Sequence, residues 1–214
     1  MGISPHPWWA PRSYPLRRVL DGYPFREVIR HNLHIMNAKN RLIILNGFSG
    51  SGKSTIAQKY IEEHPLAMNV EGDEIMAMIG GWKSHYAAAR KCIFPITKAL
   101  ISTHLNNGYD VVVPYLLVDS SQTAEFELLA EKLGVKYFEI MLANNKGEAI
   151  GRLMERGRWG EEGLPKLTKK DIPHIEDLYD RMVKATAERP NTINIYVKHN
   201  DIEDTYSRVL EVIK

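Results

Sequence analysis

The nine residues from Gly47 to Thr55 constrain this chain most, because they read Gly-Phe-Ser-Gly-Ser-Gly-Lys-Ser-Thr. They satisfy in full the pattern G-x-x-x-x-G-K-[ST], whose loop wraps around nucleotide phosphates. Such a loop lies between a buried strand and a helix, and the apolar run at 42–45 and the helical pattern at 55–63 supply both. The competing interpretation is a glycine-rich turn without a ligand, and the complete motif in this context argues against it.

The residue types of this loop match the charge of a triphosphate. Its glycines let successive backbone N–H groups point into one concavity, and the positive end of the following helix adds to that field. Lys53 is expected to reach the β- and γ-phosphates as a catalytic cation, and the Ser54 hydroxyl to hold Mg²⁺. The predicted triphosphate-binding residues of the loop are Gly47, Ser49, Gly50, Ser51, Gly52, Lys53, Ser54 and Thr55.

The composition restricts the class of protein further. A chain of 214 residues that is 44% hydrophobic, with a formal net charge of +2, suits one globular domain with a full core. This small positive charge argues against nucleic acid as the main partner. The single cysteine, Cys92, agrees with a reducing cytoplasm, and no apolar run approaches the roughly 20 residues needed to span a bilayer.

The first forty residues differ from the rest. Prolines, the pair Trp8-Trp9 and basic residues dominate the start, and an amphipathic helical pattern begins at Pro24. Three interpretations stay open: a functional arm, a disordered extension, or a start-site artefact with Met36 as the natural start. His31 and His34 share a helix face, but a third ligand is missing, so surface residues are favoured over a metal site. We expect an arm at 1–40 and one domain at 41–214.

Strand and helix patterns alternate through the remainder of the chain. We expect strands at 42–45, 66–70, 109–117, 136–142 and 192–197, and helices at 55–63, 75–79, 84–107, 120–133, 144–155, 168–188 and 201–213. Ser84 is a candidate cap and Gly108 a stop for the longest helix. This alternation, with a phosphate loop after the first strand, predicts a three-layer α/β fold with a parallel sheet.

Asp73 follows the second predicted strand, at the sheet edge where ligands of such folds bind. A carboxylate there can orient an attacking hydroxyl and accept its proton. The reference pKa of aspartate is near 4, so alignment contributes more than early deprotonation. The alternative is that Asp73 only caps the next helix. Glu71 and Glu74 are weaker candidates for the same role.

An arginine cluster lies at the end of the predicted helix 144–155, in Arg152, Arg156 and Arg158. Spacing of four places the first two on one helix face. Arginines that close over a transferring phosphoryl group stabilise its charge and exclude water, and glycines give the following segment mobility. We therefore expect a mobile lid segment at 156–167, with Arg156 catalytic; the alternative is a solvated helix end. Trp159 either covers a substrate or packs the segment down.

Taken together, these motifs resemble the small phosphate-loop kinases related to nucleoside monophosphate, gluconate and shikimate kinases. Within that group the chain looks most like chloramphenicol phosphotransferase-like and zeta-toxin-like AAA kinases. The resemblance rests on residues 47–55, Gly72-Asp73, the run 152–158 and the helix start at 201–204, and spans 41–214. It implies sheet order 2-3-1-4-5, ATP with Mg²⁺ and a hydroxyl acceptor.

The resemblance also implies roles for single residues. Asp73 would contact the acceptor, Arg152, Arg156 and Arg158 would be lid arginines on ATP, and the loop with His199 and Asn200 would flank the adenine. One departure is that the third strand, Val-Val-Val-Pro-Tyr, lacks the carboxylate that many phosphate-loop enzymes use for magnesium. Magnesium would then depend on Ser54, water and Asp73, and Pro114 and Tyr115 would line the acceptor pocket.

These features predict a cytoplasmic kinase that transfers the γ-phosphoryl of Mg-ATP to a hydroxyl of a small molecule, such as an antibiotic, sugar, nucleoside or nucleotide sugar. One alternative is a kinase of polynucleotide or tRNA-linked hydroxyls, and another is a non-catalytic nucleotide-binding switch. For a GTPase switch, the segment 145–148 has Glu where the guanine-reading motif has Asp, and we interpret it as a helix start. No feature determines the acceptor or the oligomeric state.

Overall fold

The computed structural model describes residues 40–160, 165–197 and 201–214 of the chain. Several predictions fall outside these ranges: the N-terminal arm and its helix, the possible start at Met36, and the adenine-side residues His199 and Asn200. Among the described residues, no helix is both long enough and apolar enough to cross a membrane.

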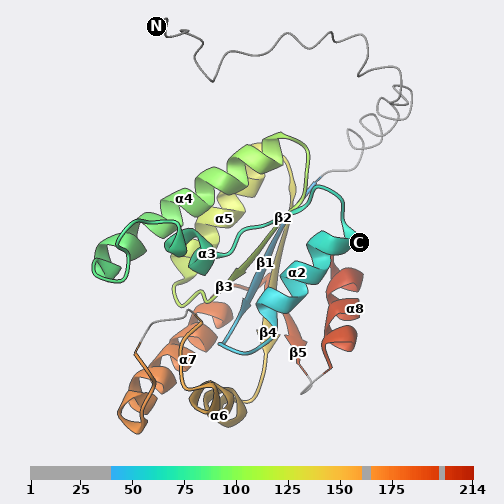
Figure 1. Cartoon of the computed structure of the whole chain (residues 1–214). Helices are drawn as coiled ribbons and strands as arrows, with labels where there is room; N and C mark the ends of the chain where they lie inside the picture. Colours follow the sequence, from blue (N-terminus) through green and yellow to red (C-terminus); the bar gives the residue numbers. More distant parts are fainter. Residues whose placement is uncertain (1–39, 161–164, 198–200) are drawn as a thin grey trace, which may run out of the picture. The chain divides into compact units, whose positions relative to one another are not determined.

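Five parallel strands form one sheet in the order β2-β3-β1-β4-β5, as the resemblance implied. The strands are β1 (Arg41–Gly47), β2 (Met68–Asn69), β3 (Val111–Tyr115), β4 (Lys136–Ala143) and β5 (Ile193–Tyr196). The central β1 pairs with β3 on one side and β4 on the other, and helices bury its apolar run on both faces. The predicted parallel α/β architecture is confirmed (Figure 1).

The described helices are α2 (Lys53–Glu63), α3 (Gly72–Ala77), α4 (Tyr86–Asn106), α5 (Ser120–Leu133), α6 (Lys146–Arg156), α7 (Ile172–Ala187) and α8 (Ile202–Val212), with a 3₁₀ turn at Lys169–Asp171. Asn145 caps α6 as expected, because its side chain accepts from the N–H groups of Gly147 and Glu148. Asp201 caps α8 in the same way by accepting from the N–H of Asp204.

Two local predictions were wrong. Ser84 does not cap α4, because residues 81–85 close turns of their own, with the N–H groups of Ser84 and His85 both donating to Gly81 O. The second strand is only two residues long. Leu66 adopts a left-handed φ of 67° in the turn after α2, so the chain becomes extended later than the apolar pattern indicated.

Helices cover both faces of the sheet, and this completes the three layers (Figure 1). On one face, Leu42, Ile44, Val111 and Val113 pack against α3, α4 and α5. On the other, Ile43, Leu45, Val112 and Ile140 pack against α2 and α8. A third apolar cluster surrounds Phe48 and includes residues of α6 and α7. The last cluster lies directly behind the phosphate loop.

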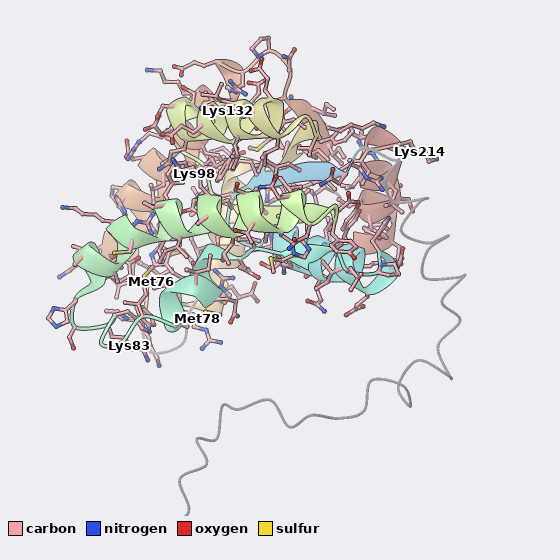
Figure 2. All side chains as sticks on the ribbon, turned by 90° about the horizontal axis from the view of Figure 1, so that it is seen from above. Met76, Met78, Lys83, Lys98, Lys132 and Lys214 are labelled. Carbon is pink, nitrogen blue, oxygen red and sulfur yellow. The ribbon has the colours of Figure 1, made fainter. Side chains whose placement is uncertain are left out.

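The connection from α3 to α4 lies at the outer side of the fold. Met76 is buried against the core, whereas Met78 is 81% exposed. Met76, Met78 and Lys83 all lie on the same side of α4 in the view from above (Figure 2). This connection therefore leads from α3, which contains Asp73, to the N-terminus of α4.

Candidate active site

The phosphate loop joins β1 to α2 and depends on close backbone approach. A Cβ at Gly47 would lie 2.9 Å from Leu142 O, so β4 and the start of the loop touch through backbone alone. Gly52 has a left-handed φ of 89°, and a Cβ there would lie 2.8 Å from Ile202 Cδ1 of α8. Side chains at these positions would open the curve of the loop, which explains the glycines of the motif.

Two side chains inside this loop are poised for an anion. The half-buried Lys53 ammonium donates to the carbonyls of Gly47 (2.8 Å) and Phe48 (3.0 Å). Burial lowers the pKa of Lys53 to about 8. The negative charges of Asp73 and Glu71 oppose this lowering, and the positive charge of Arg156 adds a smaller one. Ser51 is 1% exposed, and its hydroxyl has no hydrogen-bond partner in the described part of the chain. An oxygen of a bound phosphate would satisfy both groups, so the loop fits a nucleotide.

A carboxylate stands beside the predicted magnesium ligand. The Ser54 hydroxyl donates to Glu71 Oε1, which joins the start of α2 to the residue before α3. A serine hydroxyl and a carboxylate are both oxygen ligands of the kind Mg²⁺ takes alongside phosphates and water. The carboxylate of Asp119, past the end of β3, does not join this pair. It caps α5 by accepting from the N–H of Ser121. No group of three His, Cys, Asp or Glu side chains within the described ranges could hold a metal.

Asp73 lies at the start of α3 and does not act as a helix cap. The cap position belongs to Glu71, and the exposed Asp73 carboxylate is directed at the lid segment. A Cβ at Gly160 would lie 2.8 Å from Asp73 Oδ2, so the lid backbone touches this carboxylate. The Asp73 charge also acts on Lys53 and Arg156. Asp73 therefore lies between the loop and the lid, free of any local helix-capping role.

The described part of the lid segment, residues 156–160 and 165–167, contacts the phosphate loop through Arg156 and Trp159. Arg156 Nη2 donates to Ser49 Oγ at 2.5 Å, and Arg156 Nε donates to Arg158 O at 3.0 Å. Trp159 meets the buried Phe48 ring edge-on, with centroids 6.4 Å apart. Trp159 thus packs the segment down, which is one of its two predicted roles. Gly157 ends α6 with a left-handed φ of 69° and turns the chain toward the loop.

Other predicted site residues lie further from this group. Arg152 forms an ion pair of 3.7 Å with Glu148 on its own helix, and its buried Nε has no hydrogen-bond partner. Thr55 is exposed in the first turn of α2. Pro114 is buried within β3, whereas the half-buried Tyr115 lies against Gly72, beside Asp73. The structure thus brings Lys53, Ser54, Asp73 and Arg156 together and leaves Pro114 inside the sheet.

The roles of two residues at this site were not predicted from the sequence. Glu71 was considered only as a weaker substitute for Asp73, although it is the partner of Ser54. A signal existed, because two carboxylates that flank one glycine at a strand end both reach the ligand edge of a parallel sheet. Gly160 was expected to supply mobility, and its contact with Asp73 links positions 87 residues apart in the chain, which no local pattern encodes.

Comparisons with known proteins agree with this fold. A family model described as an AAA domain matches residues 42–168, which is more than half of the chain. No curated protein sequence matches it. Among solved structures, the tunicamycin resistance protein of Deinococcus radiodurans is 14% identical with a TM-score of 0.52, and 81% of this chain aligns with 97% of that one.

Two further structures share the fold. Shikimate kinase from Aquifex aeolicus is 14% identical with a TM-score of 0.55, over 81% of this chain and 95% of that one. A chain of the Pnkp1/Rnl/Hen1 RNA repair complex is 17% identical with a TM-score of 0.57, over 72% of this chain and only 48% of that one. At these identities the likeness concerns the fold alone. The chain therefore belongs to the AAA domain family and has the fold of the small phosphate-loop kinases.

Proposed function

We propose that this protein is a kinase that transfers the γ-phosphoryl group of Mg-ATP to a hydroxyl of a small molecule. One observation carries the proposal: three segments meet at the phosphate loop, where Lys53 donates to Gly47 O, Arg156 donates to Ser49 Oγ, and the backbone of Gly160 lies against the Asp73 carboxylate. A loop that only bound nucleotide would need the first of these, but not a carboxylate held between the loop and an arginine lid. Phosphoryl transfer uses all three.

Each side chain of the site has its own role in phosphoryl transfer. Asp73 orients the acceptor hydroxyl, whose oxygen attacks the γ-phosphorus while the bond from that phosphorus to the β,γ-bridging oxygen breaks. ADP leaves with the bond's electron pair, and the hydroxyl proton passes through Asp73 to water. Lys53 and Arg156 offset the negative charge spread over the transferring group and its leaving oxygen. The contact of Trp159 with Phe48 holds the described residues 156–160 of the lid segment on the phosphate loop, which limits water as a competing acceptor.

The Ser54 hydroxyl and the Glu71 carboxylate are the residues proposed to hold magnesium. A bound magnesium ion would offset negative charge on the triphosphate. Asp73 is then free to contact the acceptor, and it need not also bind magnesium as the sequence had suggested.

We also propose residues 41–214 as the kinase domain of a cytoplasmic protein, with 1–40 as a separate arm. The family match beginning at 42 supports this division.

The test is ADP release with antibiotics, sugars, nucleosides, nucleotide sugars and 5′-hydroxyl oligonucleotides as acceptors. On the best acceptor, Asp73→Asn should lower kcat about 10²- to 10⁴-fold and leave the ATP Kd near normal. Glu74→Gln, an exposed neighbour on the same helix, is the matched control and should keep turnover. If Asp73→Asn turns over like the wild type, the acceptor-orienting role is wrong. If ATP binds and no acceptor is phosphorylated, the protein is a nucleotide-binding switch.

A polynucleotide hydroxyl kinase is the second candidate, favoured by the fold likeness to a chain of an RNA repair complex. Such an enzyme needs a basic track along the nucleic-acid backbone, and its binding weakens steeply with salt. Phosphorylation of the 5′-hydroxyl oligonucleotide, with a KM that rises strongly between low and moderate salt, would select this candidate. Turnover of an uncharged or singly charged compound with little salt dependence would select the small-molecule kinase.

A further inference from the structure

The three serines of the phosphate loop have three different surroundings. The Ser51 hydroxyl is buried inside the loop, and the Ser54 hydroxyl donates to the Glu71 carboxylate. Ser49 is half-buried, and its hydroxyl oxygen accepts from Arg156 Nη2 at 2.5 Å. Ser49 is therefore the serine of this loop whose side chain binds the lid segment.

The guanidinium of Arg156 is fixed at two of its nitrogen atoms. Nη2 donates to Ser49 Oγ, and Nε donates to the carbonyl oxygen of Arg158 at 3.0 Å. The second bond is local, because it spans two residues within the lid segment, whereas the first spans 107 residues and reaches the phosphate loop. Ser49 therefore sets where the end of the guanidinium lies relative to the loop. A guanidinium has further N–H donors, which can bind phosphate oxygens.

The backbone that carries Arg156 is anchored as well. Leu167 N donates to Gly157 O at 2.8 Å, so the two ends of the lid segment are joined at their base. Trp159 packs edge-on against the ring of Phe48. These contacts hold the backbone of the segment but leave the long arginine side chain several rotatable bonds. The hydrogen bond to the loop restricts those bonds, so it orients the side chain.

We propose that Ser49 is a positioning residue for phosphoryl transfer, whose hydroxyl holds Arg156 at the phosphate loop before the nucleotide arrives. Because the Ser49 oxygen accepts from the guanidinium, its own O–H remains a donor for an oxygen of the bound triphosphate. The arginine then need not reorient as negative charge spreads over the transferring group, which is the benefit of a preorganised site. The proposal rests on the proposed kinase activity, in which Arg156 offsets that charge.

The competing role for Ser49 is to shape the loop or to bind ATP directly. In that role, loss of the hydroxyl would weaken ATP binding whether or not Arg156 is present. A positioning residue acts through Arg156 instead, so its loss should lower kcat in the wild type and change little once the arginine is replaced. The two roles therefore give different results in a double-mutant cycle.

The experiment combines Ser49→Ala with Arg156→Gln and measures ADP release on the best acceptor and ATP binding by calorimetry. A hydrogen bond to a charged group contributes enough that Ser49→Ala should lower kcat about 10- to 100-fold. The ATP Kd should stay within about threefold. Ser49→Thr keeps the hydroxyl and should recover most of kcat, since Ser49 is outside the left-handed region of φ. In the Arg156→Gln background, Ser49→Ala should change kcat by less than about twofold.

Ser120→Ala is the matched control, because the Ser120 hydroxyl also bonds a charged side chain, Glu188 at 2.7 Å, but at the start of α5 and outside the site. It should keep wild-type kcat. A Ser49→Ala variant with wild-type kcat, or equal losses with and without Arg156, overturns the proposal while the kinase activity stands. A loss of ATP affinity as large as the loss of kcat overturns it in the same way. If the wild type phosphorylates no acceptor, the proposed function fails, and this assignment fails with it.

Discussion

Replacing Gly160 by alanine tests whether the lid segment positions Asp73. The added Cβ would lie 2.8 Å from Asp73 Oδ2, whereas ordinary van der Waals contact begins near 3.4 Å, so one side must move by about 0.6 Å. Gly160 is outside the left-handed region of φ, so alanine fits its backbone. The far end of a short side chain yields more easily than packed backbone, and the displacement therefore falls on the Asp73 carboxylate.

The size of the effect follows from that displacement. A misplacement of about 1 Å at a reacting centre costs roughly 10²-fold in rate, so 0.6 Å should lower kcat about 10-fold. Stability should change by less than about 0.5 kcal/mol, because both residues are exposed and no core contact is lost. The ATP Kd should stay within about twofold, since the phosphate loop itself is untouched. A loss of turnover without a loss of folding or nucleotide binding is the expected signature.

Steady-state ADP release gives kcat, calorimetry gives the ATP Kd, and urea unfolding gives stability. Gly151→Ala is the matched control, because a Cβ at this exposed position of α6 would meet nothing within 4 Å. It should keep wild-type kcat and stabilise the helix by up to about 1 kcal/mol. If Gly160→Ala turns over within twofold of the wild type, the lid does not touch Asp73 during the reaction and the reasoning is refuted.

Three more outcomes are expected. Glu71→Gln should raise the Mg²⁺ concentration for half-maximal ATP binding about 10-fold without weakening metal-free ATP binding; an unchanged magnesium titration would remove Glu71 from the metal site. Asp110→Asn should lower the unfolding free energy, measured by urea unfolding, by about 2–3 kcal/mol and leave ATP binding intact. The reason is that the Asp110 carboxylate accepts from the backbone N–H and Nε of Arg41 (2.7 and 3.0 Å) and from the Tyr60 hydroxyl (2.6 Å). Burial, followed by the Asp110 hydrogen bond, raises the pKa of Tyr60, so the folded state keeps a proton that the unfolded state loses above about pH 10. Stability should therefore fall as the pH rises past 10, and Tyr60→Phe should flatten that slope in urea unfolding followed across alkaline pH.

Much of the local structure could be predicted because its signals lie within a few residues of where they act. The phosphate-loop motif specifies its own strand, turn and helix. Asn145 and Asp201 cap helices through backbone groups two or three residues away. Gly134 and Gly157 end helices by adopting left-handed φ values of 67° and 69°. Where short-range geometry competed, prediction failed: the turns at 81–85 displaced the expected Ser84 cap.

The sequence by itself therefore determined that this chain forms a parallel α/β sheet with a phosphate loop at its centre. Only the tertiary structure decided how that loop is completed. Arg156 donates to Ser49 across 107 residues, Ser54 donates to Glu71 across 17, and Gly160 lies on Asp73. The physical reason is that helix and strand periodicities describe a residue's near neighbours. Contacts between loops instead depend on the order of the strands and on which helices cover each face of the sheet.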